Sequence, residues 1–374
     1  MGEGFHNIGI LAHVDSGKTT LTEQILFLTG AIRSAGSVDA GTAATDSLSI
    51  EKQRGISVRT ATASTTWKNT NINIIDTPGH IDFAGEVERA LLALDYAIVI
   101  VSAVEGVRAH TENILKSLDK AKLPRMIFIN KTDRAGASVT SVLTELKAIS
   151  SSPFLVLTDI SDEGTENCRV READERTFCA NATEVLSDIS DEAADLFLED
   201  KSLSRERADF LIRQEISACR LTPVAFGSAK YSVGIKELID NLVKYMPDSK
   251  RRATDCLCGI VFKIEHNKSA GKISHVRLFG GEIINRDEVE LFAPDKSTVM
   301  FSDTVEIEEK SQIKEKVSQI KKFSGAKSTD IGLLKSGDVA AIYGLPSAKN
   351  GFFIGSPLKT EEADLVNPFL RVKV

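Results

Sequence analysis

The first 150 residues alternate short apolar runs with segments in which apolar residues recur at helical spacing. The apolar runs are dense in isoleucine and valine, as is typical of parallel strands buried on both faces; they cover 7–12, 72–76, 96–103 and 126–130. Between them we expect one helix over 18–29, stopped by Gly30, and another over 109–121, which ends before Pro124. Strands that alternate with helices predict an open α/β sheet.

Residues 151–220 interrupt this alternation with an acidic segment of mostly helical pattern. It holds about twice as many acidic as basic side chains, which favours a variable, solvent-facing subdomain. A docking surface for a basic protein is the alternative. The alternation then resumes with a buried strand over 223–229 and an amphipathic helix over 233–246, closed by Pro247.

The pattern changes again after a polar linker at 247–255. Short strands such as "GIVFKI", "ISHVRLFGG" and "DVAAIYG" are separated by glycine and aspartate turns, a spacing that predicts a small β-barrel. The last stretch, 367–374, has the pattern of a strand with nothing after it to pair with. It either returns to the barrel or shows that the chain is a fragment, which we favour.

Composition narrows the class of protein. A chain of 374 residues suits two or three domains, and 42% hydrophobic with 26% charged residues is typical of a soluble globular protein. The sequence contains no run of eighteen apolar residues and no basic start followed by an apolar core, so we expect neither a membrane span nor a signal peptide. Its five cysteines form no CxxC pair, which favours free thiols in a reducing cytoplasm.

The net charge of −7 argues only weakly against a nucleic-acid partner. The acidity is concentrated in the 151–220 segment, and the remainder of the chain is close to neutral or slightly basic. A surface outside that segment could therefore still meet a phosphate backbone.

The segment "AHVDSGKTT" at 12–20 nearly matches the phosphate-binding loop G-x-x-x-x-G-K-[ST]. It follows a predicted strand and opens a predicted helix, where backbone N–H groups point at an anion. Gly17 allows close backbone approach, Lys18 reaches the β- and γ-phosphates, and the hydroxyl of Thr19 binds Mg²⁺. Ala12 replaces the leading glycine, which a turn with negative φ tolerates. Taken alone, the segment could also be an ordinary strand–helix turn.

A second motif, "DTPGH" at 76–80, follows another buried strand. In nucleotide hydrolases an aspartate at such a strand end holds the Mg²⁺ shell, here Asp76, and a following glycine, here Gly79, bonds the γ-phosphate. His80 stands where other GTPases place a glutamine that orients the attacking water, and an imidazole can do the same. We therefore predict a catalytic role for His80, conditional on the nucleotide.

Two further motifs concern the base. In "NKTD" at 130–133, Asp133 can accept hydrogen bonds from the N1–H and 2-amino groups of guanine, a pair that adenine lacks. Asn130 can tie this loop to the phosphate loop, and the stem of Lys131 can cover the base. "GSA" at 227–229 would present a backbone N–H to the guanine carbonyl. Each short motif alone could occur by chance, but four in order at successive strand ends argue against chance.

Together with "EKQRGIS" at 51–57, these segments resemble the guanine-nucleotide motifs of translational GTPases of the elongation factor G branch. Within that branch, 36–57 and 71–83 are most similar to tetracycline-resistance ribosomal protection proteins. The resemblance covers essentially the whole chain. It implies a P-loop GTPase domain over 1–250, a barrel over 251–366 and the start of a third domain at 367–374. The nucleotide-binding residues it implies are Ala12, His13, Val14, Asp15, Ser16, Gly17, Lys18, Thr19, Thr20, Asp76, Thr77, Pro78, Gly79, His80, Asn130, Lys131, Thr132, Asp133, Gly227, Ser228 and Ala229.

The resemblance also implies a function. We expect a cytoplasmic, monomeric GTPase that takes GTP with Mg²⁺, releases GDP, acts on ribosomal RNA and proteins, and hydrolyses slowly without ribosomes. Three hypotheses stay open: release of tetracycline from the ribosome, translocation of the elongation factor G type, and a nucleotide-switched binding module that does not act on the ribosome. An ATPase is disfavoured by Asp133.

One residue departs from the family pattern. The expected Mg²⁺ ligands are Thr19, Ser57 and, through water, Asp76, but the family usually has threonine at the position of Ser57. A serine hydroxyl still ligates a metal, although it lacks the β-branch that restricts χ1. We therefore predict a less pre-ordered ligand in the GTP state. Unchanged GTP-over-GDP preference and ribosome-stimulated hydrolysis in Ser57→Thr would contradict this.

Overall fold

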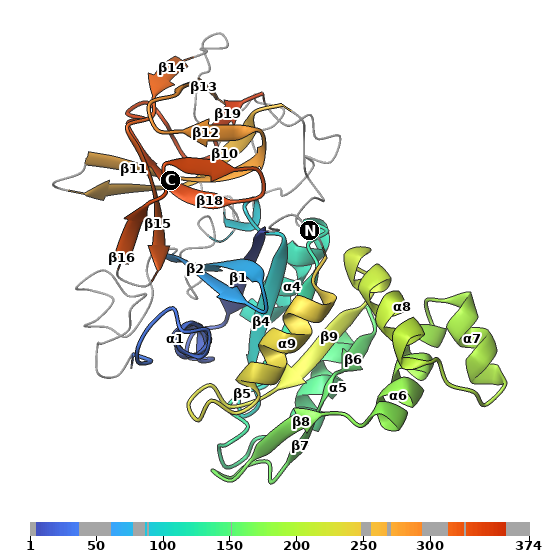
Figure 1. Ribbon diagram of the computed structural model, residues 1–374. Coiled ribbons are helices and arrows are strands. Elements are labelled where there is room, and N and C mark those ends of the chain that lie inside the picture. Colours follow the sequence, from blue (N-terminus) through green and yellow to red (C-terminus); the bar gives the residue numbers. More distant parts are fainter. Residues whose placement is uncertain are drawn as a thin grey trace, which may run out of the picture.

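The computed structural model describes most of the chain, with gaps between the ranges 5–36, 61–77, 87, 90–150, 152–247, 256–267, 271–293, 313–324 and 327–356. Within these residues an α/β part lies below an all-β part in the view of Figure 1. The expected fold class, an α/β sheet followed by β structure, is confirmed. The expected strand at 367–374 and residues 248–255 of the expected linker lie outside the described residues, so the domain bounds stay predictions.

The α/β part is built on a seven-stranded sheet in the order β2-β3-β1-β4-β5-β9-β6. Only β2 runs antiparallel, pairing with β3, and the other neighbours are parallel. The strands are β1 (Phe5–Ala12), β2 (Ala61–Trp67), β3 (Thr70–Asp76), β4 (Tyr96–Ser102), β5 (Arg125–Asn130), β6 (Phe154–Val156) and β9 (Thr222–Phe226). The four apolar runs of the first 150 residues are all strands, as predicted. The 223–229 run is strand only as far as Phe226.

Helices cover both faces of this sheet because its strands are apolar on both. Along β4, for example, Tyr96, Ile98 and Ile100 face one core, while Ala97, Val99 and Val101 face the other. The first core also takes apolar side chains from α1 (Lys18–Leu28) and α9 (Ile235–Tyr245), and the second from α4 (Ala109–Lys120) and α5 (Val139–Ile149). The ends of the parallel strands are therefore held rigidly in register.

The acidic segment is less uniform than its sequence pattern suggested. It does contain the helices α6 (Glu175–Ser187), α7 (Asp191–Leu198) and α8 (Arg205–Ser217). However, β6 adds to the edge of the main sheet, and a hairpin of β7 (Thr158–Ser161) and β8 (Arg169–Glu172) projects beside β9 (Figure 1). The expectation of a mostly helical insert missed these strands, because three- and four-residue strands carry too few positions to show a period of two.

The all-β part, residues 256–356 and called here the β domain, forms an eight-stranded antiparallel sheet within the described residues. Its order is β14-β13-β19-β10-β11-β18-β15-β16, and β12 pairs separately with β17. The bounds are β10 (Cys258–Asn267), β11 (Gly271–Gly280), β12 (Glu282–Ile284), β13 (Glu288–Phe292), β14 (Ile313–Lys316), β15 (Gln319–Ser324), β16 (Lys327–Asp330), β17 (Leu333–Lys335), β18 (Val339–Tyr343) and β19 (Phe353–Gly355). Inward-facing aliphatic side chains of these strands form a separate core.

A buried polar joint connects the two parts. The guanidinium of Arg277 on β11 is 2.9 Å from the carboxylate of Asp95, just before β4, and also donates to the carbonyl of Gly337. Asn7 on β1 donates to the same carbonyl at 3.0 Å, and Asn73 on β3 donates to Asp338 at 3.0 Å. The base of the main sheet is thus tied to the β domain at the end of the strands opposite to the predicted site.

Among the described residues, no helix is long and apolar enough to cross a bilayer.

Candidate functional site

The turn from β1 into α1 has the backbone that a phosphate loop needs. Gly17 caps α1 with φ of 93°, and no side chain caps the start of this helix. The N-terminus of a helix favours an anion, because its first N–H groups point out of the helix. Asp15 also lies in the left-handed region, with φ of 62°. A Cβ on Gly17 would stand 2.3 Å from the amide nitrogen of Asn130. The glycine is therefore required both by its φ and by the neighbouring strand end.

A buried ion pair marks the centre of this region. The ammonium of Lys18 is 2.6 Å from the carboxylate of Asp76, and the two side chains are only 8% and 3% exposed. The adjacent Thr77 is fully buried and its hydroxyl donates to the carbonyl of Ile10 at 2.9 Å, which fastens the end of β3 to β1. The phosphate-binding lysine and the metal-binding carboxylate of the sequence prediction thus lie together.

Asn130 joins three loops that are far apart in the sequence. Its amide donates to the carbonyl of Ser16 in the phosphate loop at 2.8 Å. Its side-chain oxygen accepts from the backbone N–H of Ala229 at 2.9 Å. Since Asn130 is itself 2% exposed, these bonds are shielded from water and fix the loops relative to one another.

The loop after β5 is held by a backbone hydrogen bond and by an ion pair. The N–H of Thr132 donates to the carbonyl of Gly227 at 3.3 Å, and Lys131, with φ of 66°, extends its ammonium to Glu105 at 2.7 Å. Burial alone would raise the pKa of Glu105, but the hydrogen bond and charge of Lys131 outweigh it and hold that pKa below its usual value. Asp133 is 8% exposed at the end of this loop.

The loop after β9 is tight. A Cβ on Gly227 would approach the carbonyl oxygen of Val233 to 2.3 Å and the ring of Phe128 to 2.7 Å, so packing alone demands glycine there. The backbone N–H groups of Gly227, Ser228 and Ala229 donate to Ile129, Val233 and Asn130, respectively. All three donors already have acceptors in the protein, so donation to a guanine carbonyl stays a prediction.

Some predicted residues cannot be placed. Ser57, Pro78, Gly79 and the expected catalytic His80 lie outside the described residues. Within them, Ala12 is buried at the end of β1, and the ring centroid of His13 lies 5.9 Å from that of His110 on α4. His13 therefore packs against a neighbouring helix.

The donor set fits Mg²⁺. Thr19 and Asp76 carry hard oxygen donors of the kind that Mg²⁺ prefers. The carboxylate of Asp76 already pairs with one cationic group, the ammonium of Lys18. Among the described residues no group of three or more histidine, cysteine, aspartate or glutamate side chains could hold a metal by itself. Mg²⁺ is commonly bound through one or two protein oxygens together with phosphates and water.

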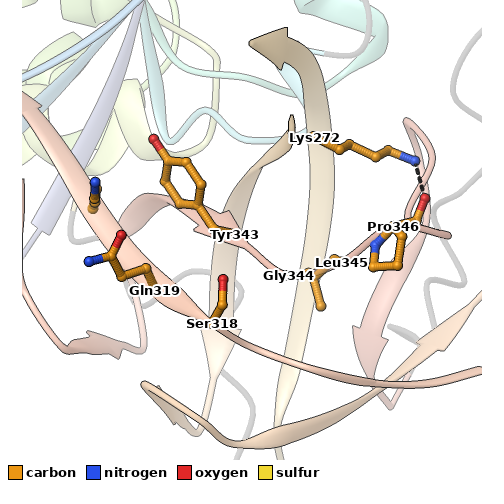
Figure 2. A pocket seen from close by; sticks show the side chains of 8 residues that line it. Lys272, Ser318, Gln319, Tyr343, Gly344, Leu345 and Pro346 are labelled. Atoms are coloured by element: carbon orange, nitrogen blue, oxygen red, sulfur yellow. Dashed lines mark hydrogen bonds between the residues drawn. The ribbon is translucent and has the colours of Figure 1, made fainter. Parts of the chain in front are cut away.

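A cavity of about 430 Å³ lies elsewhere, in the β domain. Figure 2 shows Tyr343 and Gln319 on one side of it and Lys272 on the other, where the ammonium donates to the carbonyl of Pro346 at 2.7 Å. A phosphate loop, by contrast, binds its ligand over backbone N–H groups without a deep cavity. The strand-end loops are therefore the stronger candidate.

Two contributors to the site were not predicted. Glu105 pairs with Lys131, and residues of the β7–β8 turn contact the loop after β5. No motif marks either, since a single glutamate in a turn looks like any surface charge. The contact of the β7–β8 turn depends on the strand order, which sets β9 between β5 and β6 and cannot be seen in the sequence.

Comparison with known proteins agrees with this geometry. The model of the elongation factor Tu GTP binding domain matches residues 3–248. The chain is 36% identical to the tetracycline resistance protein TetP of Clostridium perfringens, over 98% of this chain and 54% of that protein. It is 40% identical to TetM from transposon Tn1545 of Enterococcus faecalis, over 78% of this chain and 44% of that protein.

Two further matches extend over the full chain. Elongation factor G 1 of Treponema denticola is 32% identical over 100% of this chain and 60% of its own length. A crystal structure of a Thermus thermophilus protein matches with a TM-score of 0.80 and 25% identity, covering 100% of this chain and 57% of that one. The chain thus spans about half the length of these relatives. It belongs to the family of translational GTPases that carry the elongation factor Tu GTP binding domain.

Proposed function

We propose that this chain binds GTP with Mg²⁺ at the strand-end loops and hydrolyses it in response to the ribosome. The observation that carries the proposal is the side chain of Asn130, which bonds the phosphate loop on one side and the 227–229 loop on the other. A site for a nucleotide needs its phosphate end and its base end at a fixed separation, and in this proposal Asn130 sets that separation.

The base would be selected at Asp133. Its carboxylate would accept from the N1–H and 2-amino groups of guanine, each bond worth about 1.5–3 kcal/mol when one partner is charged. Two such bonds correspond to a preference over adenine of roughly a hundredfold or more. The stem of Lys131, whose ammonium is anchored on Glu105, would lie along the base face.

The phosphates would be held at the start of α1. Backbone N–H groups after Gly17 would bond the phosphate oxygens, and Lys18 would exchange its partner Asp76 for the β- and γ-phosphates. Asp76 and Thr19, with Ser57, would hold Mg²⁺, which neutralises charge on the β- and γ-oxygens during transfer. In this scheme the Lys18–Asp76 pair is the contact that the nucleotide and its metal replace.

Hydrolysis would need His80 beside the attacking water. The sequence offers no clear arginine finger, so we expect the free chain to turn over slowly and the ribosome to supply the missing placement. We propose the same cytoplasmic, monomeric setting as in the sequence-based expectation.

For the biological role we favour release of tetracycline from the ribosome. The support is the higher identity to two tetracycline resistance proteins, 36% and 40%, than to elongation factor G 1, 32%. Translocation of the elongation factor G type is the alternative, since that relative aligns with the entire chain. A nucleotide-switched module that does not act on the ribosome is the third hypothesis.

The test is GTP turnover by the purified chain with and without ribosomes, for the wild type and His80→Ala. We expect ribosomes to raise the wild-type rate at least tenfold and His80→Ala to remove the stimulation while retaining GDP binding. Release of labelled tetracycline from ribosomes, measured alongside, separates drug release from translocation. A fast rate that responds neither to ribosomes nor to the substitution would contradict the proposal.

A further inference from the structure

The β7–β8 hairpin reaches from the acidic segment to the loop that follows β5 (Figure 1). At its base, the hydroxyl of Thr158 accepts from the N–H of Phe226 at the end of β9. At its tip, the N–H of Gly164 donates to the carbonyl of Thr132 at 2.8 Å. The thiol of Cys168 lies 3.6 Å from the hydroxyl of Thr132, and both side chains are buried. Thr132 is the residue immediately before Asp133.

The same turn also contacts the elements on either side of that loop. The carboxylate of Glu163 accepts from the N–H of Val139 at 2.6 Å, at the first residue of α5. The carboxylate of Glu166 accepts from the hydroxyl of Tyr231 at 2.7 Å, just after the 227–229 loop. Residues 162–168 thus contact Thr132 beside Asp133, the start of α5 after it, and Tyr231 next to the 227–229 loop.

These contacts would not be needed for a subdomain that only faces solvent. A turn with φ of 81° at Gly164 aims its N–H at the chain of the base loop, and a Cβ there would lie 3.7 Å from the carbonyl of Arg134. The carboxylate of Glu163 faces the N-terminus of α5, where a negative charge is favoured by the helix dipole. The contacts of Gly164 and Glu163 restrain the backbone of Thr132 and Val139, whereas those of Cys168 and Glu166 join side chains.

We propose that residues 162–168 are a positioning element for guanine recognition, acting through Thr132 and the start of α5 on the carboxylate of Asp133. The proposal rests on the guanine-nucleotide site proposed above and adds a specificity determinant from the acidic segment. Gly164 and Glu163 are its positioning residues, and neither is proposed to touch the nucleotide.

The ratio of the affinities for two diphosphates that differ only in the base tests this positioning role. Inosine diphosphate lacks the 2-amino group of guanosine diphosphate, so the affinity ratio of the two reports how well Asp133 is placed. The variants are Gly164→Ala, which strains the turn, and Glu163→Ala, which removes the bond to Val139. Gly351→Ala is the matched strain control, because Gly351 has φ of 86° in the β domain with nothing within 4 Å of a new Cβ. Glu163→Gln retains an acceptor oxygen and should rescue.

We expect the wild type to prefer guanosine diphosphate at least tenfold. That preference should fall at least threefold in Gly164→Ala and Glu163→Ala, and stay at the wild-type value in Gly351→Ala and Glu163→Gln. Partial unfolding lowers both affinities together and leaves the ratio unchanged. A wild type that binds neither nucleotide would overturn the proposed function and this inference with it. A wild-type preference retained in both Gly164→Ala and Glu163→Ala would overturn the inference alone.

Discussion

The positions of single site residues depend on contacts that their sequence motifs predict only in part. The sequence predicted that Asn130 ties two loops together, and its amide does bond the carbonyl of Ser16. It could not show that Asn130 also leaves no space for a side chain on Gly17, or that Lys131 extends to Glu105. Such pairings depend on which strand ends become neighbours, and this is a property of the folded sheet.

Gly17→Ala should therefore weaken nucleotide binding through two effects. The new Cβ meets the amide of Asn130 at 2.3 Å, and φ of 93° is strained for alanine. We expect the Kd for GDP to rise at least tenfold, measured by fluorescence titration. Gly30→Ala is the control, since Gly30 has φ of 75° with nothing within 4 Å, and its Kd should change less than twofold. Equal effects of the two substitutions would refute the role of the Asn130 contact.

Thiol reactivity should separate two cysteines that are two residues apart. Cys256 is exposed, whereas Cys258 is buried on β10, and burial raises the pKa of its thiol to about 11. At pH 8 we expect Cys256 to react rapidly with a thiol reagent and Cys258 to stay unreacted until the protein unfolds. Mass spectrometry after brief labelling locates the modified residue. Rapid labelling of Cys258 in folded protein would show that β10 is not packed as described.

At the scale of elements, long apolar strands and amphipathic helices were predictable, and short or unusual ones were not. The runs that became β1, β3, β4 and β5 were read correctly because buried parallel strands are continuously apolar. The strand β2 (61–67) is rich in threonine, serine and alanine, so hydrophobicity did not reveal it. The hairpin β7–β8 was missed because its four-residue strands are too short to show a period of two, although it is the part of the acidic segment that contacts the site.

The junction of β9 and α9 offers a test of this packing. Gly234 caps α9 with φ of 74°, and a Cβ there would stand 2.2 Å from the carbonyl oxygen of Phe226. Because that atom is backbone, Gly234→Ala should destabilise the protein by roughly 2–4 kcal/mol. Gly136→Ala has φ of 84° and open space around the Cβ, so it should cost only about 1 kcal/mol. Denaturant unfolding compares the two, and similar losses would contradict the packing.

At the scale of the whole molecule, the two parts meet through polar groups as well as apolar ones. Asp95 and Arg277 are 7% and 1% exposed, and their ion pair connects the main sheet to the β domain. Nothing in the sequence marks these residues as partners, because they are 182 positions apart. The joint ties the β domain to the main sheet at the end remote from the strand-end loops.

Removing one partner of this joint should be costly. A single buried charge left without its partner typically costs about 3–5 kcal/mol, so Asp95→Ala and Arg277→Met should each lower the free energy of unfolding by about that amount. The double substitution should cost less than the sum, which a double-mutant cycle measures. The exposed pair of Glu112 and Lys116 on α4 is the control, with an expected coupling below about 0.5 kcal/mol. Additive effects at Asp95 and Arg277 would show that the pair does not couple the two parts.

Binding of guanine nucleotides at the strand ends is tested most directly by displacement of a fluorescent GDP analogue by GTP, GDP and ATP, with Mg²⁺ and with EDTA. Both guanine nucleotides should displace the analogue and ATP should not. GTP should bind more weakly in EDTA, because Asp76 and Thr19 would no longer hold a metal against its phosphates. Asp133→Asn should abolish the preference for guanine while the protein stays folded. Equal displacement by ATP, or no binding of the analogue by folded wild-type protein, would contradict a guanine-nucleotide site at these strand ends.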